Sequence, residues 1–403
     1  MRILYIIPNL QHPRVRGPHR HYHFIRELSQ RHEITLLTLV RNSVAPEAFA
    51  EIESYTEELF SFDVNGHSDN PPATRLAHVP VFGKRLEKNC KFRCGLKAMK
   101  ARFLELVNEA QFDVVCFHGK SVFSIIADWH GLPIVTDFCD ATSMRIRSSM
   151  RFNNPAKAPL YYAKSMRMRH LEKRLIKKSD QVAFISKRDR DAILGCADCS
   201  PILPLGVDSN FWRRRSSGFE PNRLVFTGVM DYAPNHDAAM HLIENIFPRI
   251  QENVQDVSLT IVGRSPKESL LQRAKKNSAI TVTGFVDDVR PYLERATVFV
   301  APVRFASGTQ NKVLEAMAMQ LPVVTTEIVR EGLVVDEQET PPALSATNEA
   351  DFAGKVATVL KDKDYRNRLA REGRRYVGKH FNWSNSASRL EALLERAVAD
   401  RHR

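Results

Sequence analysis

The segment FASGTQNKVLEAMAMQLPVV, which begins at residue 305, carries the residue types best suited to chemistry. A helix expected from about Gln310 leaves Lys312 and Glu315 on a polar face, opposite an apolar stripe that packs on its own sheet. Just before it, the amides of Gly308 and Thr309 lie at the helix N-terminus, where unpaired N–H groups and the helix dipole favour an anion. The apolar stripe consists of Leu314, Met317, Ala318 and Leu321.

These polar groups match the parts of a nucleoside diphosphate. The Lys312 ammonium suits a phosphate, and Glu315, one turn later, can accept two hydrogen bonds from a vicinal diol. An exposed Lys–Glu pair on a surface helix is the competing interpretation. The loop of small residues before the helix favours the ligand site.

Short apolar runs rich in β-branched residues alternate with helical patterns along the whole chain, as is typical of parallel strands covered on both faces. In the first half the runs are ILYIIP (3–8), EITLLTL (33–39), DVVCFH (113–118), PIVTDF (133–138) and QVAFIS (181–186). In the second half they are LVFTGV (224–229), SLTIVG (258–263), ITVTGF (280–285), VFVAPV (298–303) and PVVTT (322–326). We therefore expect an α/β protein with two Rossmann-like, doubly wound parallel-sheet domains that face each other across a cleft.

The length of 403 residues suits two domains of about 200 residues each. Prolines, glycines and a basic segment interrupt the strand pattern at 201–223, so we place the first domain at 1–205 and the second at 206–380. A last helix in 381–403 has an apolar stripe and is expected to pack back toward the first domain. Because ligands of doubly wound sheets bind at the carboxyl ends of the strands, the site should lie between the domains.

Composition and charge restrict the class of protein. The opening MRILYIIPNL is interpreted as a buried strand and not a signal peptide, and no run of 18 apolar residues occurs, so we expect a cytoplasmic protein. The net charge is +13, and residues 1–200 hold 31 Lys and Arg against 21 Asp and Glu. The basic segments 84–102 and 164–180 favour an anionic surface, whether phospholipid, nucleic acid or a charged substrate, or are simply a solvated helix face. They contain few interleaved aromatic residues, which disfavours a nucleic-acid-binding protein.

Some cysteines and histidines of the sequence are candidate metal ligands. The pairs Cys90/Cys94 and Cys196/Cys199 could form two halves of a site, but they lack the flanking residues typical of such sites. The cluster HRHYH (19–23) also suits a solvated helix start. We expect free thiols in a reducing cytosol, no metal and no cofactor.

Several motifs together resemble the retaining family 4 glycosyltransferases of the GT-B fold, and most closely their exopolysaccharide-associated sugar transferase branch. The resemblance is carried by SGTQNKVLEAMAMQLPVV, LGVDSNFW (205–212), VFTGVMDYAPNHDA (225–238), LTIVG (259–263), VTGFVDDVRPYLERATVFVAPVR (282–304) and FNW (381–383). It is strong over about 200–385, while the first half is similar mainly in pattern.

The resemblance implies roles for individual residues. Glu315 matches the acid that holds the donor ribose, and Gly308, Thr309 and Lys312 fall where the family binds the donor diphosphate and sugar. The further residues that the resemblance places at the donor are Gly263, Arg264, Gly284 and Phe285, together with Gly17 in the first glycine loop. His118, at the end of DVVCFH, matches a histidine close to the reacting centre.

Two departures from the family pattern affect the catalytic prediction. The acid usually found eight positions before Glu315 is replaced by Ser307, which can hydrogen-bond a sugar hydroxyl but supplies no carboxylate. The Arg and Lys that often clamp the diphosphate after the first strand of the second domain are absent from VMDYAPNHDAA. Lys312, Arg304 and Arg264 are the available substitutes.

The implied reaction is transfer of a glycosyl group from a nucleotide-sugar with retention of configuration, with His118, Lys312 and Ser307 as catalytic candidates. The acceptor would be a glycan or a lipid-linked molecule, and the enzyme would attach peripherally to an anionic membrane through its first domain. Asp140, which emerges with Asp137 at a strand end, either binds acceptor hydroxyls or caps its loop. A nucleotide-sugar epimerase of the same fold and a non-catalytic binding protein remain alternatives, and the oligomeric state is left open.

Overall fold

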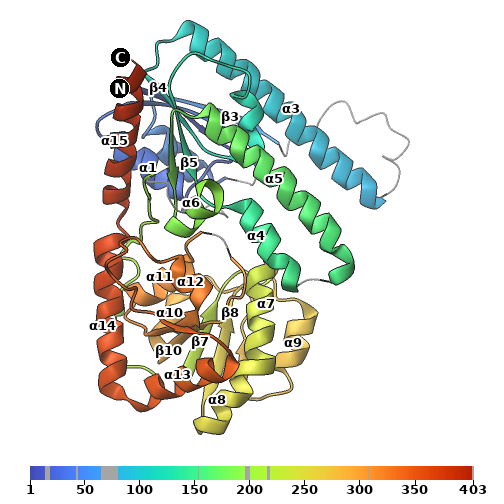
Figure 1. Ribbon diagram of the computed structural model, residues 1–403, viewed down its shortest axis with the longest axis vertical. Helices are drawn as coiled ribbons and strands as arrows, with labels where there is room; N and C mark the ends of the chain where they lie inside the picture. The colour runs from blue at the N-terminus through green and yellow to red at the C-terminus, as the bar shows by residue number, and fades with distance from the viewer. Residues whose placement is uncertain are drawn as a thin grey trace.

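The computed structural model describes residues 1–13, 19–41, 44–64, 80–152, 154–195, 200–215, 218–306 and 308–401, with the side chains of the third helix described from residue 90 onward. Two six-stranded sheets form the centres of two domains, one above the other in Figure 1. All strand pairs in both sheets are parallel. The predicted α/β class with two doubly wound sheets is therefore confirmed.

The first sheet has the order β3-β2-β1-β4-β5-β6. Its strands are β1 (Arg2–Ile7), β2 (Glu33–Val40), β3 (Glu58–Asp63), β4 (Val114–Phe117), β5 (Ile134–Phe138) and β6 (Gln181–Phe184). Its helices are α1 (Arg20–Leu28), α2 (Pro46–Glu53), α3 (Pro80–Glu109), α4 (Thr142–Ser149), α5 (Ala158–Lys178) and α6 (Lys187–Leu194), with short 3-10 turns at Lys120–Ile125, Met150–Phe152 and Pro155–Lys157.

The second sheet has the order β12-β11-β10-β7-β8-β9, which repeats the winding of the first. Its strands are β7 (Arg223–Thr227), β8 (Ser258–Val262), β9 (Ile280–Val282), β10 (Val298–Ala301), β11 (Val323–Thr326) and β12 (Leu344–Ala346). Its helices are α7 (Ala233–His241), α8 (Phe247–Asn253), α9 (Glu268–Ala274), α10 (Arg290–Arg295), α11 (Asn311–Ala318), α12 (Glu327–Glu331), α13 (Glu349–Lys361) and α14 (Lys363–His380), and a π-helical turn at Leu242–Ile246 joins α7 to α8.

Each of the ten predicted strand segments contains a strand, and two strands were missed. Both missed strands, β3 and β12, lie at the edge of a sheet. Strand β3 has partly exposed residues on both faces, and β12 has three residues. An edge strand of this kind has no continuous apolar run, so its sequence resembles that of a loop.

The last helix, α15 (Trp383–Arg401), returns from the second domain and lies against α1 (Figure 1). The Trp383 indole stacks on the His23 ring with centroids 4.3 Å apart. Farther along, Glu391 accepts two hydrogen bonds from the Arg31 guanidinium, at 2.8 and 2.6 Å, and contacts His32 at 2.8 Å. The chain thus joins the domains twice, once before β7 and once through this helix. Among the described helices, none combines the length and the apolar character needed to cross a bilayer.

Candidate functional site

Helix α11 begins at Asn311, one residue after the predicted start, and follows the loop that leaves β10. The four residues of its predicted apolar stripe are all buried. The stripe anchors the helix on its sheet, and Lys312 and Glu315 are left only partly exposed on the other side. The prediction of which face packs on the sheet and which face is polar is confirmed.

Lys312 and Glu315 form a charged pair in a poorly hydrated position. The Lys312 ammonium donates a hydrogen bond to the side-chain oxygen of Asn235 and lies 5.1 Å from the centroid of the Phe226 ring. Burial raises the pKa of the Glu315 carboxyl to about 7, against the attraction of Lys312. Burial also lowers the pKa of the Lys312 ammonium to about 8. No described residue hydrogen-bonds the Glu315 carboxylate, so its oxygens can accept hydrogen bonds from a ligand.

The Gly308 amide, which we expected to meet a ligand anion, has an anionic partner within the chain. It donates to both carboxylate oxygens of Asp189 in α6, at 3.1 and 3.0 Å. The neighbouring Arg188 guanidinium donates to the carbonyl oxygens of Ala306, Gly308 and Ile328. These contacts tie the first domain to the loop before α11. No local sequence pattern predicts these contacts, because α6 and that loop are more than 100 residues apart.

Four predicted donor residues, Gly263, Arg264, Gly284 and Phe285, lie where strands of the second sheet end. Gly263 has a φ of 149°, and a Cβ there would lie 1.7 Å from the Gly228 carbonyl oxygen, so only glycine fits. Its amide donates to the Gly284 carbonyl at 3.2 Å. Arg264 follows, and its buried Nε has no hydrogen-bond partner among the described atoms. Phe285, beside Gly284, is 69% exposed and presents a free ring surface.

Arg304 is already paired. Its guanidinium donates to both carboxylate oxygens of Asp237 in α7, one of them at 2.9 Å. It also lies 4.5 Å from the centroid of the Phe152 ring, which stacks on Phe305. Because its charge is balanced by Asp237, Arg304 is a weaker substitute for the missing diphosphate clamp than we expected. Arg264 and Lys312 remain as the predicted cations without a carboxylate hydrogen-bond partner among the described residues.

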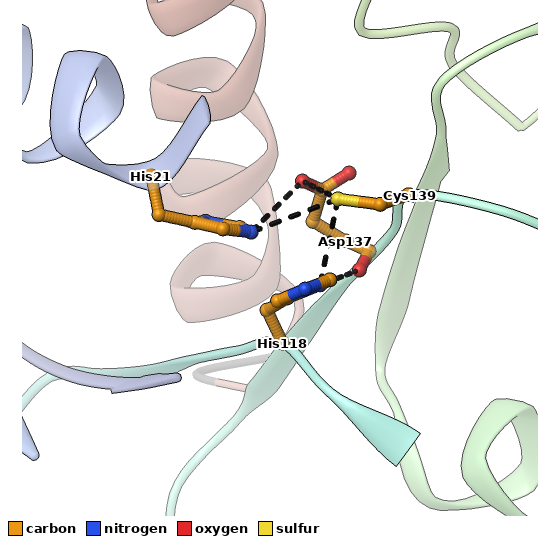
Figure 2. Close-up of side chains that lie close together, drawn as sticks. All are labelled: His21, His118, Asp137 and Cys139. Atoms are coloured by element: carbon orange, nitrogen blue, oxygen red, sulfur yellow. Dashed lines mark hydrogen bonds and ion pairs between the residues drawn. The ribbon is translucent and has the colours of Figure 1, made fainter. Parts of the chain in front are cut away.

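His118 follows β4 and belongs to a compact cluster with His21, Asp137 and Cys139 (Figure 2). Its Nδ1 lies 2.9 Å from the Asp137 carbonyl oxygen, which accepts a hydrogen bond from it. Burial lowers the pKa of the His118 imidazole, so the ring is neutral near neutral pH. Part of this cluster, with Lys120 and Asp140, lines a cavity of about 230 Å³ at the carboxyl edge of the first sheet.

Asp140, the predicted acceptor residue, is engaged by its own domain. Its carboxylate accepts hydrogen bonds from the Lys120 ammonium at 2.9 Å and from the Thr142 hydroxyl at 2.8 Å, and Arg145 lies 3.5 Å away. Burial opposes its charge, but Lys120 and Thr142 lower the pKa of the carboxyl to about 2. These contacts favour the interpretation that Asp140 organises its loop.

A groove of about 600 Å³ lies between α4, α5 and the second domain, and the sequence analysis did not find it. Four arginines line it. Arg304 is paired with Asp237, whereas Arg147, Arg151 and Arg169 form no ion pair with another described residue. Its apolar lining comes from Met144, Met150, Phe152 and Met166 on the first domain and Ile328 on the second. In the sequence, the only signal was the alternation of arginine with methionine in RIRSSMRF and KSMRMRH.

Some predicted residues lie outside the described part of the chain. They are Gly17 of the first glycine loop, Ser307, and the cysteines Cys196 and Cys199. Thr309 is described, and its hydroxyl donates to the Gly332 carbonyl at 2.8 Å. Cys90 and Cys94, the other half of the proposed cysteine site, are free thiols on α3.

Comparisons with known proteins agree with this arrangement. Residues 221–362 match the model of the family described as Glycosyl transferases group 1. Glycogen synthase of Mycobacterium tuberculosis is 27% identical over 242 residues, which cover 56% of this chain and 56% of that protein. Phosphatidyl-myo-inositol mannosyltransferase of Mycobacterium leprae is 28% identical over 159 residues, or 39% and 42% of the two chains. The chain spans about half the length of the curated relatives that it matches.

Solved structures extend the similarity to the whole chain. Sucrose-phosphate synthase from Thermosynechococcus elongatus has a TM-score of 0.67 at 15% identity and covers 99% of both chains. Anabaena HepE in complex with UDP and glucose has a TM-score of 0.63 at 11% identity, covering 98% of this chain and all of that one. At these identities the likeness shows the fold: two Rossmann-like domains in the GT-B arrangement.

Proposed function

We propose that this chain, whose second domain matches the group 1 glycosyltransferases, is a retaining glycosyltransferase that moves a sugar from a nucleotide-sugar to an acceptor. The observation that carries the proposal is the pair of Lys312 and Glu315 on α11. Glu315 has no hydrogen-bond partner among the described residues, and Lys312 carries its charge one turn away. A ribose diol and a diphosphate supply the partners that these two groups need.

The chemistry assigned to the site is stabilisation of the leaving diphosphate. Lys312 and Arg264 would neutralise its developing charge, and no metal is required for that step. The departing phosphate would help to take the proton from the incoming hydroxyl on the same face of the sugar. His118, with its ring held by the Asp137 carbonyl, would bind the transferred sugar near the reacting carbon.

The acceptor would lie in the groove between α4 and α5. Arg147, Arg151 and Arg169 offer charge to a phosphate or diphosphate group, and the methionines and Phe152 offer apolar contact to a hydrocarbon chain. This combination fits a lipid-linked acceptor of cell-surface polysaccharide or glycolipid synthesis. Two relatives have names that point the same way, a capsular polysaccharide biosynthesis glycosyltransferase of Staphylococcus aureus and the mannosyltransferase already described.

Donor binding is tested by calorimetry with UDP, GDP and ADP. We expect Lys312→Ala and Glu315→Ala each to lower the affinity for the nucleotide that binds by about 10- to 100-fold. This is the loss expected when a hydrogen bond to a charged group is removed. Lys276→Ala and Glu252→Ala change an exposed Lys and an exposed Glu of the same domain and should leave the affinity unchanged. Unchanged affinity in both site variants would refute the donor site.

The reaction is tested separately by product analysis. The chain is incubated with cell-envelope lipid extracts and with nucleotide-sugars that carry the same base as the nucleotide that binds. The products are examined for a new glycolipid with the anomeric configuration of the donor. Formation of an epimerised nucleotide-sugar would instead favour the epimerase alternative. Tight nucleotide binding with no turnover of any donor would favour a binding protein without catalysis.

A further inference from the structure

The cluster behind the cavity of the first domain brings together four side chains that commonly bind metal ions. His21 comes from the first turn of α1, His118 follows β4, and Asp137 and Cys139 come from the end of β5. Figure 2 shows the four side chains pointing toward a common centre. One possible ligand atom from each lies within 4.8 Å of the others, and His21 and Asp137 are buried.

The distances between these atoms match those between the ligands of a tetrahedral ion. His21 Nε2, Asp137 Oδ2 and Cys139 Sγ form a triangle with three sides of 3.7 Å. His118 Nδ1 lies 3.6 Å from the Cys139 sulfur. Ligands held at about 2.0–2.3 Å around a tetrahedral zinc ion lie about 3.3–3.8 Å from one another. These four separations fall in that range, and all six lie within 4.8 Å.

Hydrogen bonding alone does not account for this spacing. An N–H···O bond has a length of about 2.7–3.2 Å, so His21 Nε2 and Asp137 Oδ2, at 3.7 Å, are not bonded to each other. Both side chains have no exposed surface, so water does not satisfy the imidazole nitrogen from outside. A sulfur contact of 3.7 Å is the only hydrogen bond described for that nitrogen. The Asp137 oxygen already accepts a hydrogen bond from Arg20 at 2.7 Å, so His21 Nε2 is the buried atom that has no close partner among the described residues.

Contacts around the cluster already orient the ligands. The Tyr5 hydroxyl lies 2.8 Å from His21 Nδ1 and leaves Nε2 directed at the cluster. The Arg20 guanidinium holds the Asp137 carboxylate at 2.7 and 3.1 Å, and it also donates to the backbone carbonyls of Leu203 and Pro204. Metal-binding histidines and carboxylates typically have outer partners of this kind, which fix their orientation.

We propose that His21, Asp137, Cys139 and His118 form a zinc site in the first domain. His21 Nε2, Asp137 Oδ2 and Cys139 Sγ supply three ligands, and His118 occupies the fourth corner. Two imidazoles, a thiolate and a carboxylate form a ligand set that suits Zn²⁺. Ligation releases the thiol proton of Cys139, and the proton that His118 Nδ1 otherwise gives to the Asp137 carbonyl moves to Nε2, so that the imidazole stays neutral. The thiolate and carboxylate then balance the two charges of the ion, and backbone carbonyls share the charge of Arg20.

This site is distinct from the diphosphate site, because all four ligands belong to the first domain. It joins the start of α1 to the ends of β4 and β5, beside the cavity that His118 lines. The proposed zinc site replaces our expectation that the first domain holds no metal. It does not alter the proposal that Lys312 and Arg264 stabilise the diphosphate without a metal.

Metal content of the full chain, purified without chelator, tests the site. We expect about one zinc per chain by mass spectrometry of the metal, and less than a fifth of that in Cys139→Ala and His21→Ala. Cys139→His, which restores a ligand, should recover zinc. Cys94→Ala changes an exposed thiol on α3 and should keep the full content. Full zinc content in Cys139→Ala and His21→Ala would overturn the proposal.

Cobalt substitution decides the question even where a variant fails to fold. Unsubstituted protein, stripped by a chelator and supplied with Co²⁺, should show a thiolate-to-cobalt charge-transfer absorption and the intense visible bands of a tetrahedral site. Addition of Zn²⁺ should remove both. Absence of the charge-transfer band from the unsubstituted protein, or its persistence in folded Cys139→Ala, would refute the zinc site.

Discussion

At the scale of single residues, Glu315 and Lys312 lower the stability of the folded chain because their charged groups are partly buried at the proposed binding site. Both charges are held in a position where burial disfavours them, and Glu315 has no described hydrogen-bond donor to compensate. A pKa of about 7 for Glu315, above that of an unfolded glutamate, means that its contribution to stability is complete below pH 4.5 and is lost as the pH rises through 7. The pH dependence of Lys312 is opposite. Because its pKa is lowered to about 8, its contribution to stability is present at high pH and is lost as the pH falls through about 8.

Glu315→Gln should therefore make the folded protein more stable while it weakens nucleotide binding. At pH 8 we expect the free energy of unfolding to rise by about 1–2 kcal/mol, less than the full change in pKa implies because the side chain is partly exposed. At pH 5, where Glu315 is protonated in the folded state, the difference should largely disappear. Urea denaturation at the two pH values measures this, with Glu252→Gln as an exposed control. A gain of equal size at both pH values would contradict the assignment.

Sequence reasoning succeeded for residues whose neighbours along the chain define their environment. Lys312 and Glu315 follow from the period of one helix, and Gly263 from its place after a strand. Asp189 and Cys139 could not be found in this way. Their partners, Gly308 for the first and His21 for the second, are more than 100 residues distant and meet them only when the sheets are assembled.

Helix α15 depends on a close backbone approach at the scale of elements. Gly206 lies against the Trp383 ring, and a Cβ on Gly206 would come within 2.3 Å of it. Gly206→Ala should lower the free energy of unfolding by about 1–3 kcal/mol, because the indole must leave its stack on His23. Gly378→Ala in α14 is the matched control, since nothing lies within 4 Å of its Cβ and a helical alanine should be neutral or slightly stabilising. Equal thermal midpoints for the two variants would argue against the contact.

Helix α5 is the element that we expect at a membrane surface. Leu160, Tyr162 and Met166 are exposed on it, at 54, 49 and 46%, among many lysines and arginines. The chain should float with vesicles that contain anionic lipid and lose that binding as salt rises, because each basic residue near the surface contributes about 1 kcal/mol. Changing these three residues to serine should reduce flotation several-fold, while Leu104→Ser on α3 should not. Equal flotation with neutral vesicles at high salt would exclude this mode of attachment.

Whether a strand could be predicted from the sequence depended on how fully that strand is buried. Strands covered on both faces, such as β1 and β10, were found because their buried residues form a continuous apolar run, Ile3–Ile7 in β1 and all four residues of β10. Strand β3 was missed because its residues are partly exposed on both faces, and β12 because it has only three residues. The groove beside α4 was missed for a related reason. Its arginines and methionines belong to two helices and one loop, and no single segment carries the pattern.

For the whole molecule, the contacts between α6 and the loop before α11 join the two domains. Arg188 reaches three carbonyl oxygens of the second domain, and Asp189 accepts the Gly308 amide. The same loop carries the start of α11, where the donor diphosphate is proposed to lie. The contacts between the domains therefore also hold the loop that precedes the proposed diphosphate site.

Arg188→Ala should release this constraint. Because the variant loses the hydrogen bonds to Ala306, Gly308 and Ile328, we expect the ligand-free chain to sample more open arrangements and its radius of gyration, measured by X-ray scattering, to increase. Saturating nucleotide should restore most of the compaction, and the apparent affinity should fall severalfold because binding must then close the domains. Arg190→Ala is the matched control on the same helix, since Arg190 contacts Asp191 and Ser200 within the first domain. An unchanged radius of gyration in Arg188→Ala would mean that the two chain crossings, before β7 and through α15, set the domain arrangement without Arg188.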